Sequence, residues 1–517
     1  MKRSDTDAGH SSGLSQTSVL GLAGLVLPLL CGLVFFWRER TIANVDDLFF
    51  VPWAFELAET GRHWNGLLSV QFPGLENYHL QPRIHLVLAG WFFSLTGTDT
   101  TMLVLFEFLC YLLTSLVFVW ICLKLDLKLA ALFTPLIFAP MYVVAGFRLE
   151  VSGSLLFVLG LALLMPVLLK TAAKDRSRSP LMTGSNVLGM SLLGIAPLAA
   201  PAVFAWSLGA IVVLQLWRII ARQAGLLRVL VEGLAAFVLA LAVFAVSIDF
   251  QFSAFIDQFT YHASRSTGGG FNDEAIFRAL AFTVVSVVLF RKSREATIFC
   301  AMLALGQFLA AFLHDKALIR NLAASMVFLI AFDALLSSRW TGVKVALATV
   351  LFLVLSANFF SFYLFSSDLE NRTDVVAAYR QDLDDGKRVF IDETMAHHYL
   401  DQQTDGALAW TWGGTFPKGR PTALTDLKDG DVWYVSEYTL LGYLKGRHDV
   451  AERALAGVEY QRVLQVPCVL GRHSCNLPVD RWKMLRLERK DGEVFLQELG
   501  RDPAPQRLNG DQVSTSS

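Results

Sequence analysis

Charged residues are scarce in this chain. Asp, Glu, Lys and Arg make up 17% of its 517 residues, whereas hydrophobic residues make up 54%, and the mean hydropathy is +0.48. Soluble domains carry about 25% charged residues, so this composition is typical of a polytopic membrane protein. The formal net charge of -1 leaves no global basic field, and nothing in the composition supports a nucleic-acid partner.

Cofactor motifs are also missing. The sequence has no Walker loop, no dinucleotide fingerprint, no Cys/His metal cluster and no internal repeat. Four of the six cysteines lie within hydrophobic runs, where packing is the expected role. Cys468 and Cys475 lie in the polar C-terminal region. They would pair only in an oxidising compartment, and spacing alone leaves that pairing open.

Long apolar runs, by contrast, recur along the chain. A helix of about 20 apolar residues can cross a bilayer. The first run is long, and no small-residue cleavage site precedes the charges that follow it, so we expect a span rather than a cleaved signal peptide. The eleven expected spans are 19–36, 101–123, 129–147, 152–169, 187–198, 202–217, 229–248, 276–290, 297–313, 318–336 and 345–365.

The segment 84–95 is too short to cross and is expected to lie at the membrane interface. With that choice, Lys and Arg are concentrated in every second loop, as the positive-inside rule requires. Counting 84–95 as a span would invert all later loops. We therefore expect a multi-pass protein of the inner (plasma) membrane, with a cytoplasmic N-terminus and an extracytoplasmic, periplasmic C-terminus.

The composition changes at residue 366 to that of a soluble domain. We expect three parts: a transmembrane catalytic domain (1–365) with a first outer loop at 37–100, an extracytoplasmic α/β domain (366–500), and a disordered tail (501–517). Within the second part, patterning predicts a helix at 374–385 and strands at 387–391, 431–435, 460–466 and 482–487.

Acidic residues on the expected outer face are the candidates for chemistry. Asp46 and Asp47 follow the first span and precede an amphipathic run, 48–64. Carboxylates at a membrane boundary are costly unless solvated, paired or used. They could also cap the helix that follows. Glu150 stands beside Arg148, which allows either an ion pair that closes a span end or a group that positions a substrate.

Basic and imidazole side chains of the same loops complete the candidate site. Guanidinium and ammonium groups suit a phosphate, although Arg320 could simply reach the interface. A lone histidine is more often structural than ligating. The candidate phosphate-binding residues are Arg148, Arg265, Lys316 and Arg320, and the candidate substrate-binding residues are His79, His85 and His262. Among the acidic residues within expected spans, Glu107 could border the site, whereas Asp333 is expected to have no part in it.

These motifs resemble those of the GT-C superfamily of membrane glycosyltransferases, particularly the lipid A aminoarabinose transferases and protein O-mannosyltransferases. Asp46-Asp47 stands where these families have Asp-Glu, and Glu150 matches the acidic residue after their third span. His262-Ala263-Ser264-Arg265 matches a His-x-x-Arg of a later outer loop. Gln81-Pro82 stands in place of a Lys-Pro and lacks its cation. The resemblance covers about 19–320.

The resemblance implies a GT-C fold and an enzyme that transfers a sugar from a polyprenyl-phosphate donor to a lipid, glycan or protein acceptor. Asp46, or Asp47, would be the base that deprotonates the acceptor hydroxyl, Glu150 would position a substrate, and cations would stabilise the leaving phosphate. No cofactor is required by the sequence, and a divalent Mg²⁺ or Mn²⁺ ion is left open. The alternatives are a membrane transporter, a lipid-linked glycan polymerase or ligase, and a non-catalytic envelope scaffold.

Overall fold

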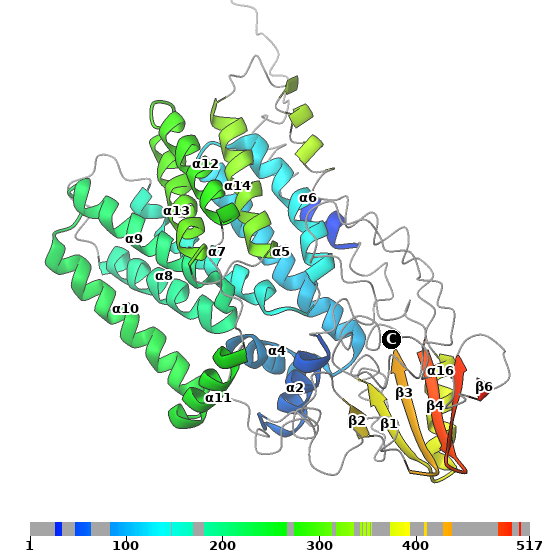
Figure 1. The fold of residues 1–517 in the computed structure, drawn as a ribbon. Helices are drawn as coiled ribbons and strands as arrows, with labels where there is room; N and C mark the ends of the chain where they lie inside the picture. Colours follow the sequence, from blue (N-terminus) through cyan, green and yellow to red (C-terminus); the bar gives the residue numbers. More distant parts are fainter. Residues whose placement is uncertain are drawn as a thin grey trace, which may run out of the picture.

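The protein is described here from a computed structural model. It describes residues 26–33, 47–63, 83–145, 147–168, 180–265, 273–312, 317–335, 342–343, 345–347, 349–351, 353, 373–392, 408–410, 428–436, 484–498 and 506–507. The described part is mostly helical, with one small sheet near the C-terminus (Figure 1). The expected strand 460–466, Cys468 and Cys475 lie outside these residues.

The helices form a bundle in which neighbours along the chain pack together. They are α2 (Asp47–Thr60), α4 (Arg83–Thr96), α5 (Thr100–Lys124), α6 (Lys128–Ala145), α7 (Leu149–Leu168), α8 (Pro180–Ala199), α9 (Phe204–Ile220), α10 (Leu226–Ser247), α11 (Phe252–Arg265), α12 (Asp273–Leu289), α13 (Arg294–Ala310) and α14 (Ala317–Leu335). Helix α5 packs on α6, α7 on α8, and α12 on α13, while α13 also packs on α9 and α14 on α6.

Every expected span between residues 101 and 336 falls on one of these helices. Among the described residues, three helical segments are long and apolar enough to cross a membrane: Thr101–Lys124, Pro201–Ile220 and Leu226–Ser247. The structure therefore supports a membrane-associated helical protein, and the number of eleven spans stays a prediction. The short interfacial helix expected at 84–95 is α4, which begins one residue earlier and ends one later.

Helix α11 was not expected, because the sequence analysis treated its residues as part of an outer loop. Its apolar residues Phe252, Phe255, Ile256 and Phe259 recur at helical spacing, which is the signal that would have revealed it. Phe255 contacts Phe244 of α10, whereas Ile256 and Phe259 are exposed. Such an amphipathic helix suits a membrane interface.

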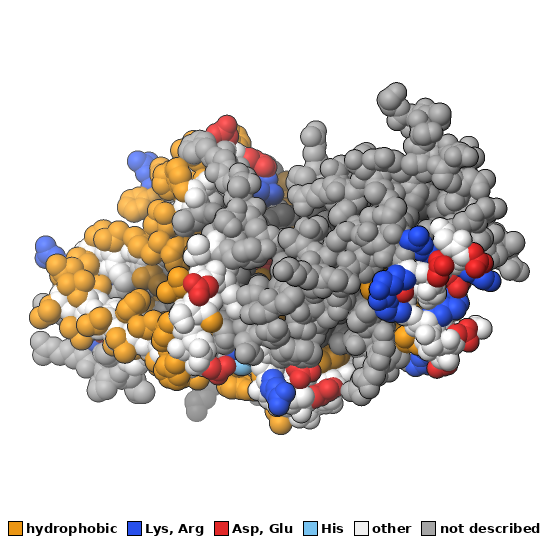
Figure 2. All heavy atoms as spheres, turned by 60° about the horizontal axis from the view of Figure 1, so that its bottom comes forward, with side chains coloured by type: hydrophobic (Ala, Val, Ile, Leu, Met, Phe, Trp, Pro, Cys, Tyr) orange, Lys and Arg blue, Asp and Glu red, His pale blue; other side chains and the backbone are white. Residues whose placement is uncertain are grey.

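Apolar side chains cover one side of the helical part, and charged side chains gather over the sheet at the other end of the molecule (Figure 2). Helices α10 and α12 contribute many of the large exposed apolar side chains, among them Leu230, Leu234, Phe237, Phe277, Val284 and Val287. An apolar surface of this extent is costly in water and suits a lipid environment.

Two features hold helices at fixed separations inside the bundle. Gly209 of α9 lies against Gly306 of α13, where a Cβ on Gly209 would stand 2.6 Å from the Gly306 nitrogen. Asp333 of α14 accepts hydrogen bonds from the backbone N–H groups of Leu129 and Ala130, at 2.7 and 3.1 Å. Asp333 therefore caps the start of α6 from a neighbouring helix, a structural role that agrees with its exclusion from the candidate site.

The C-terminal sheet has the strand order β2-β1-β3-β4-β5-β6. Strand β1 is parallel to β2 and β3, and the remaining pairs are antiparallel. The strands are β1 (Arg388–Asp392), β2 (Leu408–Trp410), β3 (Asp431–Ser436), β4 (Met484–Lys490), β5 (Glu493–Glu498) and β6 (Gln506–Arg507). Three of the expected strands correspond to β1, β3 and β4. Strand β6 forms within the tail for which the sequence predicted disorder.

Helix α16 (Thr373–Asp384), expected at 374–385, is joined to this sheet by a buried carboxylate. Asp382 accepts hydrogen bonds from Arg486, Tyr434 and Lys387. Burial acts to raise the pKa of Asp382, but these hydrogen bonds outweigh it and leave the pKa below its ordinary value of 3.8. The charged form of Asp382 therefore stabilises the folded domain.

We expect Gly209→Ala to destabilise the protein by about 1–3 kcal/mol, because the added methyl group would force α9 and α13 apart. The matched control is Gly233→Ala in α10, where a Cβ meets nothing within 4 Å and which should be neutral or stabilising by up to about 1 kcal/mol. Thermal melting of the purified protein in detergent measures both, and equal melting temperatures for the two variants would contradict the close α9–α13 contact.

We expect the C-terminal domain to lose stability on acidification below about pH 4. A lowered folded-state pKa means that the contribution of Asp382 is complete above its unfolded value and disappears as the pH falls through the folded value. Asp382→Asn should cost on the order of 2 kcal/mol at neutral pH and flatten this dependence. Backbone hydrogen exchange in β1 and β3 of the full chain, corrected for intrinsic exchange rates, measures the stability of the domain at each pH. The control is Asp384→Asn, at an exposed aspartate of the same helix.

Candidate functional site

The candidate site lies where α4 meets the beginning of α7 and the end of α10. Helix α4 has 14 residues, a length of about 21 Å, which is shorter than a bilayer core. It packs against α2, with the rings of Phe55 and Phe93 in edge-to-face contact at 5.0 Å. In Figure 1, α2, α4 and α11 lie together at one end of the bundle.

His85, in the first turn of α4, is fully buried. Its Nδ1 lies 2.8 Å from Ser152 Oγ of α7, and its ring lies against Phe147 at 4.6 Å between centroids. Because Ser152 Oγ donates to the Leu149 carbonyl, we assign the proton to Nδ1, which then donates to Ser152. Nε2 is left as an acceptor and has no hydrogen-bond partner among the described residues.

The pKa of His85 explains why this imidazole is neutral. Burial lowers its pKa to about 4, although the charge of Glu150 and the Phe147 carbonyl act in the opposite direction. His85 therefore offers a neutral nitrogen at physiological pH. The same interaction shows that Glu150 lies close enough for its charge to act on the ring.

Glu150 is 2% exposed and lies in the first turn of α7, where the positive end of the helix dipole favours a carboxylate. Arg148 pairs with it through Nε at 3.1 Å from Oε2 and Nη2 at 3.4 Å from Oε1. The Arg148 side chain is 18% exposed. The pair thus joins a buried anion to a cation that reaches the surface.

Arg83, the first residue of α4, holds this helix in place. Its Nε donates to the Ser247 carbonyl at the end of α10, and its Nη2 donates to Asp249 at 3.1 Å. Burial lowers the pKa of Arg83 to about 10, against the opposing charge of Asp249, so it remains a cation. His63 Nε2 lies 3.7 Å from the same Asp249 carboxylate.

The structure brings together three of the site residues expected from the sequence: His85, Arg148 and Glu150. Arg320, in the first turn of α14, lies close enough to Glu274 of α12 for their charges to interact. Asp47 is the first residue of α2, and His262 and Arg265 lie near the end of α11, but their side chains are not described. Asp46, His79 and Lys316 lie outside the described residues.

Arg83, Ser152 and Asp249 were not among the site residues expected from the sequence. The available signal for Arg83 was its position directly after Pro82, at the start of the expected interfacial helix and one residue beyond the motif that lacks its cation. Ser152 carried no signal, since a serine in an apolar run is ordinary. Asp249 stands at positive φ, 52°, in the turn after α10, a conformation that Asp tolerates better than most residues.

Within the described residues, no group of three or more His, Cys, Asp or Glu side chains could hold a metal ion, so we assign no metal ligands. No family model, curated protein or solved structure matches this chain. The resemblance to GT-C enzymes therefore rests on the short motifs and stays a prediction.

We expect Arg83→Gln to destabilise the protein by about 1–3 kcal/mol, because the shorter amide would leave the carbonyl of the buried Ser247, at the end of α10, unsatisfied. The matched control is Arg62→Gln, an exposed arginine after α2, which should change the melting temperature little. If the two variants melt alike in detergent, Arg83 does not hold α4 against α10.

Proposed function

We propose that the protein is an integral membrane glycosyltransferase of GT-C type, in the inner membrane, that transfers a sugar from a polyprenyl-phosphate donor to a lipid, glycan or protein acceptor. The observation that carries this proposal is the ion pair of Arg148 with the buried Glu150, beside the unpartnered Nε2 of His85. A buried carboxylate is costly, and a cluster that joins it to a cation and a neutral imidazole is typical of a functional site.

The proposed roles follow from the chemistry of the transfer. Asp46 or Asp47 accepts the proton of the acceptor hydroxyl as its oxygen attacks the anomeric carbon. The bond between that carbon and the phosphate oxygen breaks, and the phosphate leaves with additional negative charge. Cations, among them Arg148, stabilise that charge. Glu150 positions the acceptor or the sugar, and the lone pair on His85 Nε2 accepts a hydrogen bond from a substrate hydroxyl.

The position of the cluster supports an extracytoplasmic site. Helix α10 has 22 residues, about 33 Å, which is close to the thickness of the bilayer core. At its end, Ser247 binds Arg83 next to the cluster, and at its beginning Arg228 and Glu232 pair near the basic α9–α10 turn. The basic turn is the cytoplasmic side by the positive-inside rule, so the cluster would face outward.

We expect Glu150→Gln to lower sugar transfer by about 100-fold or more, because a neutral amide loses the charged contact to Arg148 and the substrate. Asp46→Asn and Asp47→Asn should show which of them is the base. The assay is transfer from a panel of polyprenyl-phosphate sugars in proteoliposomes, with mass spectrometry of lipid A, glycans and surface proteins in cells.

The matched control is Asp126→Asn, an exposed carboxylate in the α5–α6 turn whose positive φ, 58°, suits Asn as well as Asp. It should transfer at the unaltered rate. Full transfer by Glu150→Gln, or solute movement across the proteoliposome without any glycosylated product, would count against the proposal.

A further inference from the structure

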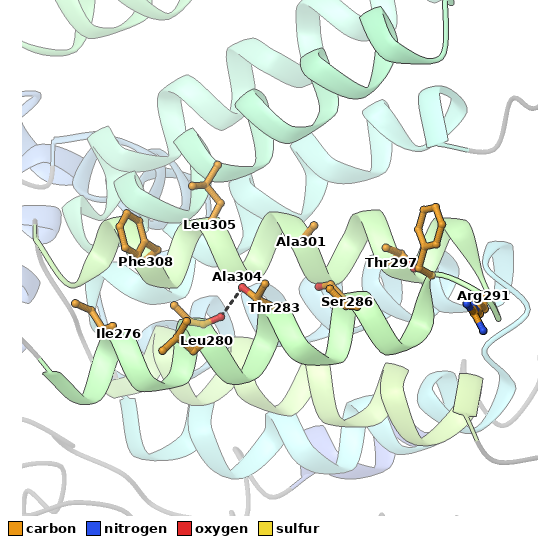
Figure 3. Close-up of a pocket in the computed structure, with 13 residues that line it drawn as sticks. Ile276, Leu280, Thr283, Ser286, Arg291, Thr297, Ala301, Ala304, Leu305 and Phe308 are labelled. Carbon is orange, nitrogen blue, oxygen red and sulfur yellow. Dashed lines mark hydrogen bonds between the residues drawn. The ribbon is translucent and has the colours of Figure 1, made fainter.

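A groove with a cavity volume of about 610 Å³ runs between α12 and α13. Figure 3 shows Ile276 and Phe308 at one end and Arg291 at the other. From Ile276 the groove follows α12 to its end and reaches Arg291 in the turn beyond, a length of roughly 22 Å. This is longer than the hydrocarbon part of one bilayer leaflet, about 15 Å.

The groove wall is apolar along this length. Its three hydroxyl groups all donate to backbone carbonyls one turn earlier in the chain: Thr283 to Ala279 (Figure 3), Ser286 to Phe282, and Thr297 to Ser293. Because each hydroxyl proton is already donated to a backbone carbonyl, none of the three is left to bind a ligand. The groove opens on a face where α12 exposes large apolar side chains, so what enters it comes from an apolar phase.

Basic side chains gather at the Arg291 end. Arg294 stacks on Trp217 of α9 at 4.0 Å, which brings the α12–α13 and α9–α10 turns together. Across 218–232 and 291–295 the basic residues are Arg218, Arg222, Arg228, Arg291, Lys292 and Arg294, with Glu232 and Glu295 as the carboxylates. Glu232 is already shared by Arg218 and Arg228. The turns therefore carry an excess of positive charge.

We propose that this groove binds one acyl chain of an anionic phospholipid, whose headgroup phosphate lies on Arg291 and the neighbouring cations. Guanidinium groups bind phosphate through paired hydrogen bonds, and basic pockets beside membrane helices recognise anionic headgroups. The groove ends in charge at the side opposite the Arg148–Glu150 cluster, so this lipid is not the sugar donor. The bound lipid contacts both α12 and α13 and thereby stabilises the bundle.

The test uses the full-length protein in detergent, titrated with phosphatidylglycerol or, in parallel, phosphatidylcholine, with thermal melting as the readout. Phosphatidylglycerol should raise the melting temperature, and phosphatidylcholine should raise it less. Arg291→Gln should weaken the apparent phosphatidylglycerol affinity about fivefold, the contribution of one basic residue at an anionic surface. Ala301→Leu, which fills the groove, should abolish the difference between the two lipids.

The matched control is Lys128→Gln, which removes an exposed cation at the first residue of α6 and should bind phosphatidylglycerol as the unaltered protein does. Equal responses to both lipids, or an unchanged affinity in Arg291→Gln, would overturn the proposal. If Ala301→Leu fails to fold, phosphatidylglycerol with a photoreactive acyl chain is crosslinked to the unaltered protein, and the crosslinked residues are mapped. Crosslinks in 276–308 support the groove, and crosslinks confined to other helices overturn it.

Discussion

The hydrogen bonds of Arg83 determine where the candidate site can form. The guanidinium is buried and charged, so it must find partners in a medium of low dielectric. It finds them in the Ser247 carbonyl and the Asp249 carboxylate at the end of α10. This attachment holds the first turn of α4 against the bundle. Two residues further along α4, His85 contacts Ser152 at the start of α7. The position of the imidazole thus depends on an arginine that has no proposed part in the chemistry.

The bundle has two chemically different ends. At one end a buried anion, Glu150, is paired with Arg148 and lies near a neutral histidine. At the other, arginines outnumber carboxylates, and Arg294 stacks on Trp217. Between them the helices expose apolar side chains and contact one another closely through glycines such as Gly209 and Gly306. A protein with this distribution can present one kind of chemistry to each face of a membrane.

Much of the helical architecture was predictable, because apolar runs long enough to cross a bilayer leave helix as the only conformation that satisfies the backbone. The short helix at 83–96 and the strands at 388–392 and 431–436 were predictable for similar local reasons. Helix α11 was missed although its apolar residues follow helical spacing, since its low hydropathy and position between spans favoured a loop. Strand β5 was missed although a local signal was present, since Asp491-Gly492, both at positive φ, form the two-residue hairpin turn that joins β4 to β5.

The sequence by itself determined a helical membrane protein with a small α/β domain, because hydropathy and periodicity are local properties of the chain. It also identified Glu150, Arg148 and His85 as candidates, since polar groups beside apolar runs are conspicuous. Only the tertiary structure decided that these three lie together, that Asp333 caps another helix and that Arg83 anchors α4. Each of those facts joins residues far apart in the chain, such as Arg83 and Asp249 or Leu129 and Asp333, and no local pattern records which distant partner will satisfy a buried charge.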